Sequence, residues 1–169
     1  MTGGERVSEQ TRKQLNYTIA CIHEFARKNR MSQQAAFQYL HKYKGIAFLS
    51  EFYDVEHTLS LDDALDDIQE TDDPVLFPDA ARRGRIEKGW CSEVSKAEML
   101  IEYATQDIVS WIMEEDHLPM EEALAKFYSS TTFAKLADTE TGLYLDAPGS
   151  VYCLYRDEAK AGRFVQNEI

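Results

Sequence analysis

An apolar pattern typical of helices occurs twice in this sequence, about 86 residues apart. Between Leu15 and Met31 apolar residues recur at spacings of three and four, which would place them on one face of a helix. From Met31 onward, the matching residues are 87 positions apart instead of 86. The matched pairs are Leu15–Ile101, Tyr17–Tyr103, Ile22–Ile108, Phe25–Trp111 and Ala26–Ile112 at 86, and Met31–Leu118, Ala36–Ala123, Phe37–Leu124, Leu40–Phe127, Ile46–Phe133 and Leu49–Leu136 at 87. The pattern predicts a duplicated helical unit.

The boundaries of these units follow from turn and cap signals. We expect a flexible tail over residues 1–11, a first unit over 12–70, a linker over 71–94 and a second unit over 95–169, each unit with three to four helices. No stretch shows sustained strand alternation, so the predicted fold class is all-α. A unit of about 60 residues buries only a small core. The two related units are therefore expected to pack into one compact helical body.

Several polar residues and glycines predict where helices begin and end. Ser32 is a good N-cap for the second helix, and Gly45 is expected to stop it. Ser95 with Glu98 three residues later forms a capping-box pattern at the start of the second unit. Further caps are expected at Ser60 for a helix ending near Ile68, at Thr132 for a short helix, and at Asp146 for a closing helix with Val151, Leu154 and Tyr155 on its inner face.

The net charge of −12 and the pI near 4.7 argue against nucleic-acid binding, which needs a basic face, and they permit a basic protein partner. The three cysteines have no CxxC pair, which favours a reducing compartment over a disulfide framework. The sequence shows neither a signal-peptide pattern nor an apolar run that could span a bilayer. We expect a cytoplasmic protein that contacts neither membrane nor nucleic acid.

No pattern in the chain predicts catalysis, a metal or a cofactor. The four histidines fall in different predicted elements, and no zinc, EF-hand or phosphate-loop spacing is present. Cys21 and Cys153 lie among apolar residues, where a buried, inert thiol is expected. We therefore expect a protein that is not an enzyme and that has no catalytic, cofactor-binding or metal-binding residues.

A helix near the end of the first unit would carry a strongly negative outer face. Its acids are Asp62, Asp63, Asp66 and Asp67. As a hypothesis, these four residues steer a basic partner, while neighbouring Tyr53 and the linker residue Phe77 anchor it. A solvated acidic face is the alternative. The linker also holds a basic cluster of Arg82, Arg83, Arg85 and Lys88, which would either meet an anionic group or neutralise the acidic helix.

Tyrosines exceed what two small cores need. Because tyrosine offers a large contact area with few rotatable bonds, exposed copies often belong to interfaces. The alternative is that they seal the contact between the two units, and the sequence does not decide between the two. The residues concerned are Tyr39, Tyr43, Tyr53, Tyr128, Tyr144, Tyr152 and Tyr155.

Two segments resemble known families. The run from Leu40 to Thr58, ending in Phe52-Tyr53-Asp54-Val55-Glu56-His57-Thr58, resembles a widespread family of short, uncharacterised bacterial helical proteins. A similar companion group is indicated by Tyr103-Ala104 to Asp107-Ile108, Met120-Glu121-Glu122-Ala123-Leu124, Lys126-Phe127-Tyr128 and Glu140-Thr141-Gly142-Leu143-Tyr144-Leu145. Together the resemblances cover residues 12–70 and 96–157, and this chain differs from the short members in joining both units.

The resemblance implies an antitoxin-type component, encoded beside an ADP-ribosyltransferase-like toxin that it binds and neutralises. It supplies no functional residues. The first hypothesis is therefore a non-enzymatic module that occludes a protein partner with a basic surface. The alternative is a structural or scaffold protein that self-associates as a homo-oligomer, for which a dimer burying Tyr128 and Tyr144 would be the sign.

Overall fold

The computed structural model describes residues 7–56 and 94–163, which form helices joined by short turns, and none of these residues forms a strand. This confirms the all-α fold class. The first half contains α1 (Glu9–Asn29), α2 (Gln33–Lys42), α3 (Gly45–Glu51) and α4 (Tyr53–Glu56). The second half contains α6 (Lys96–Asp116), α7 (Met120–Tyr128), α8 (Thr131–Ala137), the 3-10 turns η1 (Thr139–Thr141) and η2 (Leu143–Leu145), and α9 (Pro148–Ala161).

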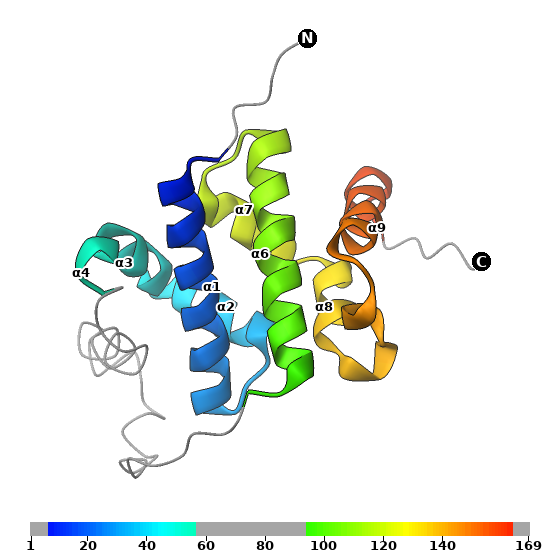
Figure 1. Ribbon diagram of the computed structural model, residues 1–169, viewed down its shortest axis with the longest axis horizontal. Helices are drawn as coiled ribbons and strands as arrows, with labels where there is room; N and C mark the ends of the chain where they lie inside the picture. Colours follow the sequence, from blue (N-terminus) through cyan, green and yellow to red (C-terminus); the bar gives the residue numbers. More distant parts are fainter. Residues whose placement is uncertain (1–6, 57–93, 164–169) are drawn as a thin grey trace.

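The two long helices α1 and α6 lie side by side and run in opposite directions at the centre of the molecule (Figure 1). The backbone N–H of Val7 donates to Glu114 Oε1 at 3.1 Å near one end of the pair, and His23 Nδ1 lies 3.8 Å from Glu102 Oε2 near the other. Helices α2 and α7 pack against this pair and against each other, while α3 flanks α1 and α9 flanks α6. The halves therefore share one central four-helix contact.

The two halves have the same plan, and most of their equivalent positions are 87 residues apart. Helices α1 and α6 both contain 21 residues, and α3 and α8 both contain 7. Ser8 and Ser95 are the N-caps of the long helices, and the side chain of each accepts a hydrogen bond from the backbone three residues later. Arg30 and His117 end these helices with the same left-handed backbone, φ 52° and ψ 44°. The starts of α1 and α6, their N-caps and their last residues are each separated by 87 positions, whereas α3 and α8 begin 86 residues apart.

A pair of buried threonines supports the same shift. The hydroxyl of Thr18 donates to the carbonyl of Gln14 at 2.9 Å, and that of Thr105 donates to the carbonyl of Ile101 at 2.7 Å. The shift of 86 predicted for the first helix is thus wrong by one residue. Apolar positions on a helix recur after three or four residues, so a one-residue slip still places many apolar residues on apolar ones.

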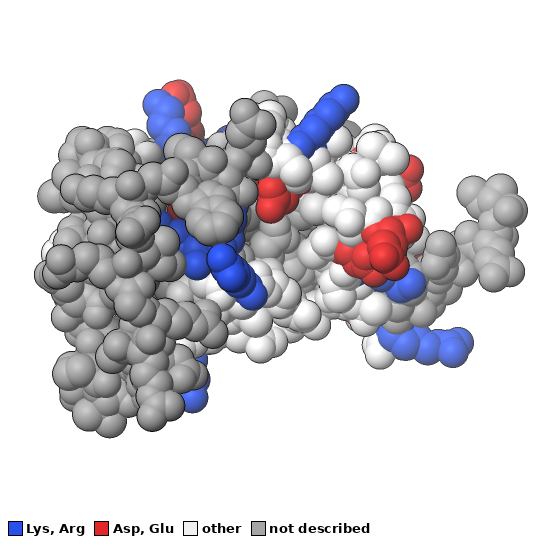
Figure 2. Space-filling view, turned by 90° about the horizontal axis from the view of Figure 1, so that it is seen from below, with Lys and Arg blue, Asp and Glu red and all other residues white. Residues whose placement is uncertain are grey.

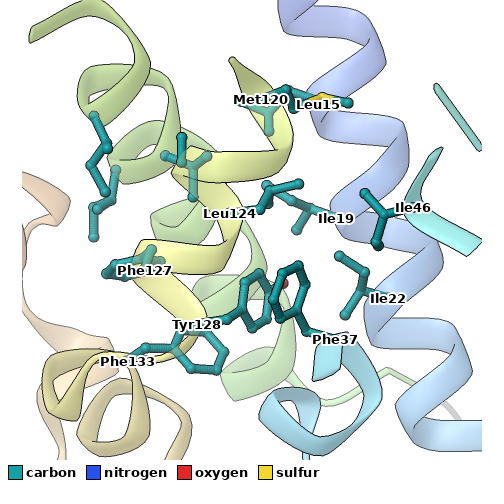
Figure 3. Packing of buried hydrophobic residues seen from close by; sticks show 14 of the residues in the cluster. Leu15, Ile19, Ile22, Phe37, Ile46, Met120, Leu124, Phe127, Tyr128 and Phe133 are labelled. Atoms are coloured by element: carbon teal, nitrogen blue, oxygen red, sulfur yellow. The ribbon is translucent and has the colours of Figure 1, made fainter. Parts of the chain in front are cut away.

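The core is shared between the halves (Figure 3). Phe37 of α2 and Tyr128 of α7 stack face to face, with ring centroids 4.7 Å apart and planes at 13°. Phe133 of α8 lies 4.3 Å from the same tyrosine ring, on the second half's side. The six pairs predicted at 87 have matching burial: five are fully buried in both halves, and Met31 and Leu118 are both partly buried.

Contacts between α2 and α7 exchange under the same shift. Gln34 Nε2 donates to the carbonyl of Tyr128 at 2.8 Å, and His41 Nε2 lies 3.4 Å from Glu121 Oε1. Gln34 and Glu121 are equivalent positions, 87 residues apart, and so are His41 and Tyr128. Such reciprocity, in which i contacts j and j contacts i, characterises an interface with two-fold symmetry. The halves are therefore arranged like the subunits of a dimer within one chain.

The closing helix α9 is attached to the start of α8 by one carboxylate. Glu158 accepts hydrogen bonds from the backbone N–H groups of Thr131 and Thr132, at 2.7 and 2.8 Å, and from the Thr132 hydroxyl at 2.7 Å. Burial raises the pKa of this carboxyl, but the hydrogen bonds from the two threonines outweigh that effect, so the pKa lies below its usual value. Its charge also suits the positive end of α8.

Some predicted caps are confirmed and others are wrong. Ser32 accepts from the backbone of Ala35, and Ser95 with Glu98 forms the complete capping box. Gly45 begins α3 instead of ending α2, because Lys44 takes the left-handed conformation, φ 62°. The cap of α8 is Ser130 and not Thr132; that of α9 is Ala147 and not Asp146. The predicted helix over residues 60–68 and nearly all of the 71–94 linker lie outside the described residues.

Candidate interaction surface

Most of the residues predicted to bind a partner fall outside the part of the chain that the structure describes. These are Asp62, Asp63, Asp66, Asp67 and Phe77, together with the basic cluster Arg82, Arg83, Arg85 and Lys88. Tyr53 is described, and it begins α4. Its side chain is only 9% exposed and packs edge-on against Tyr17, with ring centroids 5.7 Å apart. The folded chain therefore leaves little of Tyr53 for a partner to contact.

The tyrosines divide between core and surface. Tyr128 and Tyr155 are buried, and Tyr39, Tyr144 and Tyr152 are partly buried against the core. Tyr128 lies in the contact between the halves. For this residue the structure agrees with the alternative in which tyrosines seal the contact between the two units. A dimer that buries Tyr128 is therefore ruled out, since that ring is already inaccessible in a single chain.

The described parts of the two halves differ in formal charge. Residues 7–56 contain 7 Lys/Arg and 5 Asp/Glu, a formal charge of +2, whereas residues 94–163 contain 6 Lys/Arg and 13 Asp/Glu, a formal charge of −7. Figure 2 shows one face on which acidic and basic side chains form small groups, in places side by side, between uncharged areas. Residues 57–93, with 4 Lys/Arg and 10 Asp/Glu, add a further formal charge of −6, so acidic charge is not confined to residues 94–163.

Large apolar side chains are exposed mainly on the same acidic half. Met99 and Tyr103 are 43% and 57% exposed and lie one turn apart on α6, so they share one face of that helix. Val94 at 43% and Leu145 at 68% belong to the same half, and Phe52 at 43% is the example in the first half. No sequence signal marks Met99 or Tyr103 as exposed. At the predicted shift of 86, Tyr103 is paired with Tyr17, another tyrosine, and does not stand out.

A polar cluster is buried between α1, α2 and α6. His23 Nδ1 lies 3.4 Å from Gln33 Nε2 and 3.8 Å from Glu102 Oε2. Burial lowers the pKa of His23 to about 4, so its ring is neutral at neutral pH. Burial raises the pKa of Glu102, and the charge of Arg27 offsets part of that rise. Among the described residues, His23 Nε2 and Gln33 Oε1 have no hydrogen-bond partner.

The hydroxyl of Tyr128 is a third buried polar atom without a hydrogen-bond partner within the described part of the chain. Burial raises its pKa well above the usual value, and the nearby charge of Glu102 adds to the rise. Polar atoms left unpaired in a core cost free energy. The aromatic rings at the interface between the halves thus pack closely, while the buried Tyr128 hydroxyl among them has no hydrogen-bond partner within the described residues.

The described residues also bear on metals, thiols and membranes. No group of three or more His, Cys, Asp or Glu side chains within residues 7–56 and 94–163 could hold a metal ion. Cys21 is buried, as predicted, whereas Cys153 is exposed, so the prediction for Cys153 is wrong; it lies on the outer side of α9. None of the described helices is both long and apolar enough to cross a membrane.

Comparison with known proteins gives one finding. Residues 16–71, about a third of the chain, match the profile of a family described as "protein of unknown function (DUF3791)". This segment begins in α1 and extends beyond α4, so it lies in the first half. No curated protein matches the chain, and no solved structure does. The similarity assigns no role to any residue.

Proposed function

We propose that this chain is a non-enzymatic binding module that holds a protein partner with a basic surface. The observation that carries the proposal is the coincidence of charge and apolar exposure: residues 94–163 have a formal charge of −7 and also expose Val94, Met99, Tyr103 and Leu145. Apolar contact supplies affinity at protein interfaces, while complementary charge speeds association and selects the partner. A rigid helical body presenting both is suited to occluding another protein.

The resemblance to antitoxin-type components narrows this proposal. The partner would be an ADP-ribosyltransferase-like toxin encoded next to this chain, and binding would neutralise it in the bacterial cytoplasm. The predicted acidic residues Asp62, Asp63, Asp66 and Asp67 would then assist in attracting the toxin. Two tandem units of the matched family, the second at residues 103–158 by the shift of 87, would form the binding body.

Co-expression tests the proposal. The chain is produced together with the products of the adjacent reading frames, and the complex is purified through a tag on the chain. We expect one neighbouring product to co-purify, and its toxicity to growth to disappear when this chain is present. The association rate should fall as salt is added, because the attraction between opposite charges is screened. A chain that purifies alone and rescues no growth defect would refute the proposal.

Size-exclusion chromatography with light scattering distinguishes the alternative, a self-associating scaffold. A stable homo-oligomer that binds no neighbouring product would favour the scaffold. The net charge of −12 opposes close approach of two copies, so we expect a monomer at low salt.

A further inference from the structure

We propose that Glu102, at the contact of α1 with α6, makes the pairing of the two halves selective, so that each half binds the other and rejects a copy of its own kind. The inference goes beyond the proposed function and does not depend on it. Selectivity matters because a chain is synthesised from its N-terminus, so a first half can meet another first half before its own second half exists. The observation that carries the inference is a difference between the two ends of the α1–α6 contact (Figure 1).

One end of this contact is polar. His23 of α1 is buried, and its Nδ1 lies 3.8 Å from Oε2 of Glu102, whose side chain is only 25% exposed. Burial raises the pKa of the Glu102 carboxyl, whereas the positive charge of Arg27 lowers it. Burial lowers the pKa of His23 to about 4, so its ring is neutral at neutral pH. The charge that stabilises the Glu102 carboxylate is therefore that of Arg27, a residue of the other half.

The other end of the contact holds the equivalent positions with different chemistry. The pairs at the shift of 87 are Glu102 with Leu15, His23 with Ser110 and Arg27 with Glu114. Leu15 and Ser110 are fully buried, and Ser110 Oγ accepts a hydrogen bond from Arg12 Nη2 at 3.1 Å. Because α1 and α6 run in opposite directions, a two-fold pair of identical halves would have the same residues at both ends. In this chain one end combines a carboxylate with a cation, and the other has an apolar side chain and a hydroxyl at the positions equivalent to Glu102 and His23.

Exchanging equivalent positions shows what a pair of like halves would contain. In a pair of two second halves, Glu102 would meet Glu114 where it meets Arg27 in the chain, and this would occur at both ends. Two carboxylates in a largely buried site repel each other, and no cation from Arg27 would compensate them. In a pair of two first halves, Arg27 would meet Leu15 and keep only its ion pair with Glu24 of the same helix. Only the unlike pair joins opposite charges across the contact.

The contact between α2 and α7 also differs between the halves, but it is less able to select. His41 Nε2 lies 3.4 Å from Glu121 Oε1, and these two side chains are 44% and 49% exposed. Ion pairs with this exposure contribute little, because water screens the charges. The charge of Glu102 is less accessible to water, so we assign the selective role to that residue.

The test lets the halves pair again after the chain has been cut. A specific protease site is placed within residues 76–90, and the cleaved chain is unfolded in urea and then diluted into native buffer. Native mass spectrometry distinguishes the unlike pair from the two like pairs by their masses. Random pairing would make about half of all pairs unlike, whereas we expect the unlike pair of the wild type to outnumber the like pairs at least about tenfold.

Two variants remove the charges that are held to select. Glu102→Gln removes the carboxylate with little change of shape, and Arg27→Gln removes the cation that compensates it. Each should lower the ratio of unlike to like pairs at least about fivefold. Glu122→Gln is the matched control, since it makes the same chemical change at an exposed residue of α7, and its ratio should equal that of the wild type. Circular dichroism of the uncut variants establishes that each is folded.

A ratio for Glu102→Gln equal to that of the wild type would overturn the inference, and so would random pairing of the wild-type fragments. Fragments that form no pairs at all, in the wild type or in both variants, would overturn it as well, because the inference requires like pairs to form once the charge is removed.

Discussion

Removing one oxygen atom from the interface between the halves should make the protein more stable. The side chain of Tyr128 is fully buried, and its hydroxyl has no hydrogen-bond partner among the described residues. The Tyr128 ring packs against two other rings: its centroid lies 4.7 Å from that of Phe37 and 4.3 Å from that of Phe133. Tyr128→Phe keeps these ring contacts and deletes the unpaired group.

The size of the effect follows from the cost of a buried, unpaired polar group, about 1–3 kcal/mol. We expect Tyr128→Phe to raise the free energy of unfolding by that amount. For a chain of this length each kcal/mol shifts the melting temperature by about 2–4 °C, so the expected rise is about 2–12 °C.

Urea unfolding followed by circular dichroism measures the change, with Tyr152→Phe as the control. The hydroxyl of Tyr152 accepts a hydrogen bond from Arg156 Nη1 at 3.1 Å, so the same chemical change there should lower stability, by about 0.5–1.5 kcal/mol. If Tyr128→Phe instead destabilised the protein as Tyr152→Phe does, the Tyr128 hydroxyl would have a partner, and the description of this interface would be wrong.

Three further perturbations test other parts of the structure. Burial lowers the pKa of His23 from its usual 6.5 to about 4 in the folded chain. Between these values only the unfolded chain binds the proton, so stability should fall by up to about 3 kcal/mol as the pH is lowered from 6.5 to 4. His23→Gln should remove that slope from a series of urea titrations. Arg30 and His117 are the two equivalent residues with left-handed backbone. Because glycine adopts this conformation without strain, Arg30→Gly and His117→Gly should each raise the free energy of unfolding by about 0.5–1 kcal/mol. An effect at only one site would count against their equivalence. Glu158→Gln should lower the free energy of unfolding by about 1–2 kcal/mol and speed hydrogen exchange of the α9 backbone amides. Unchanged hydrogen exchange would mean that other contacts hold α9 in place.

Local signals in the sequence predicted much of the fold. The helix starts at Ser32 and Ser95 depend on side chains that bond to the backbone three residues later, which a sequence window contains entirely. The six apolar pairs at a shift of 87 could be predicted because those positions are apolar in both halves. Where the choice depended on backbone strain, the prediction is wrong: Gly45 was expected to stop the second helix, but the left-handed turn falls at Lys44 and Gly45 begins α3.

Features that depend on tertiary packing could not be predicted. Whether Tyr53 or Cys153 faces the core is decided by elements distant in the sequence, and the structure buries the first and exposes the second. The polar cluster of His23, Gln33 and Glu102 combines three helices, so no single sequence window contains it. The equivalence of Met99 and Tyr103 with Arg12 and Asn16 depends on the helix caps at Ser8 and Ser95, which fix the shift at 87.

The central claim is that the two halves form one body through the contact of α1 and α2 with α6 and α7. The most direct test inserts a specific protease site within residues 76–90, cleaves the folded chain, and measures the mass of the product by size-exclusion chromatography with light scattering in native buffer. The account predicts a single species with the mass of the uncleaved chain, held together by contacts such as the Phe37–Tyr128 stack. Two separate fragments, each eluting with its own smaller mass, would contradict it.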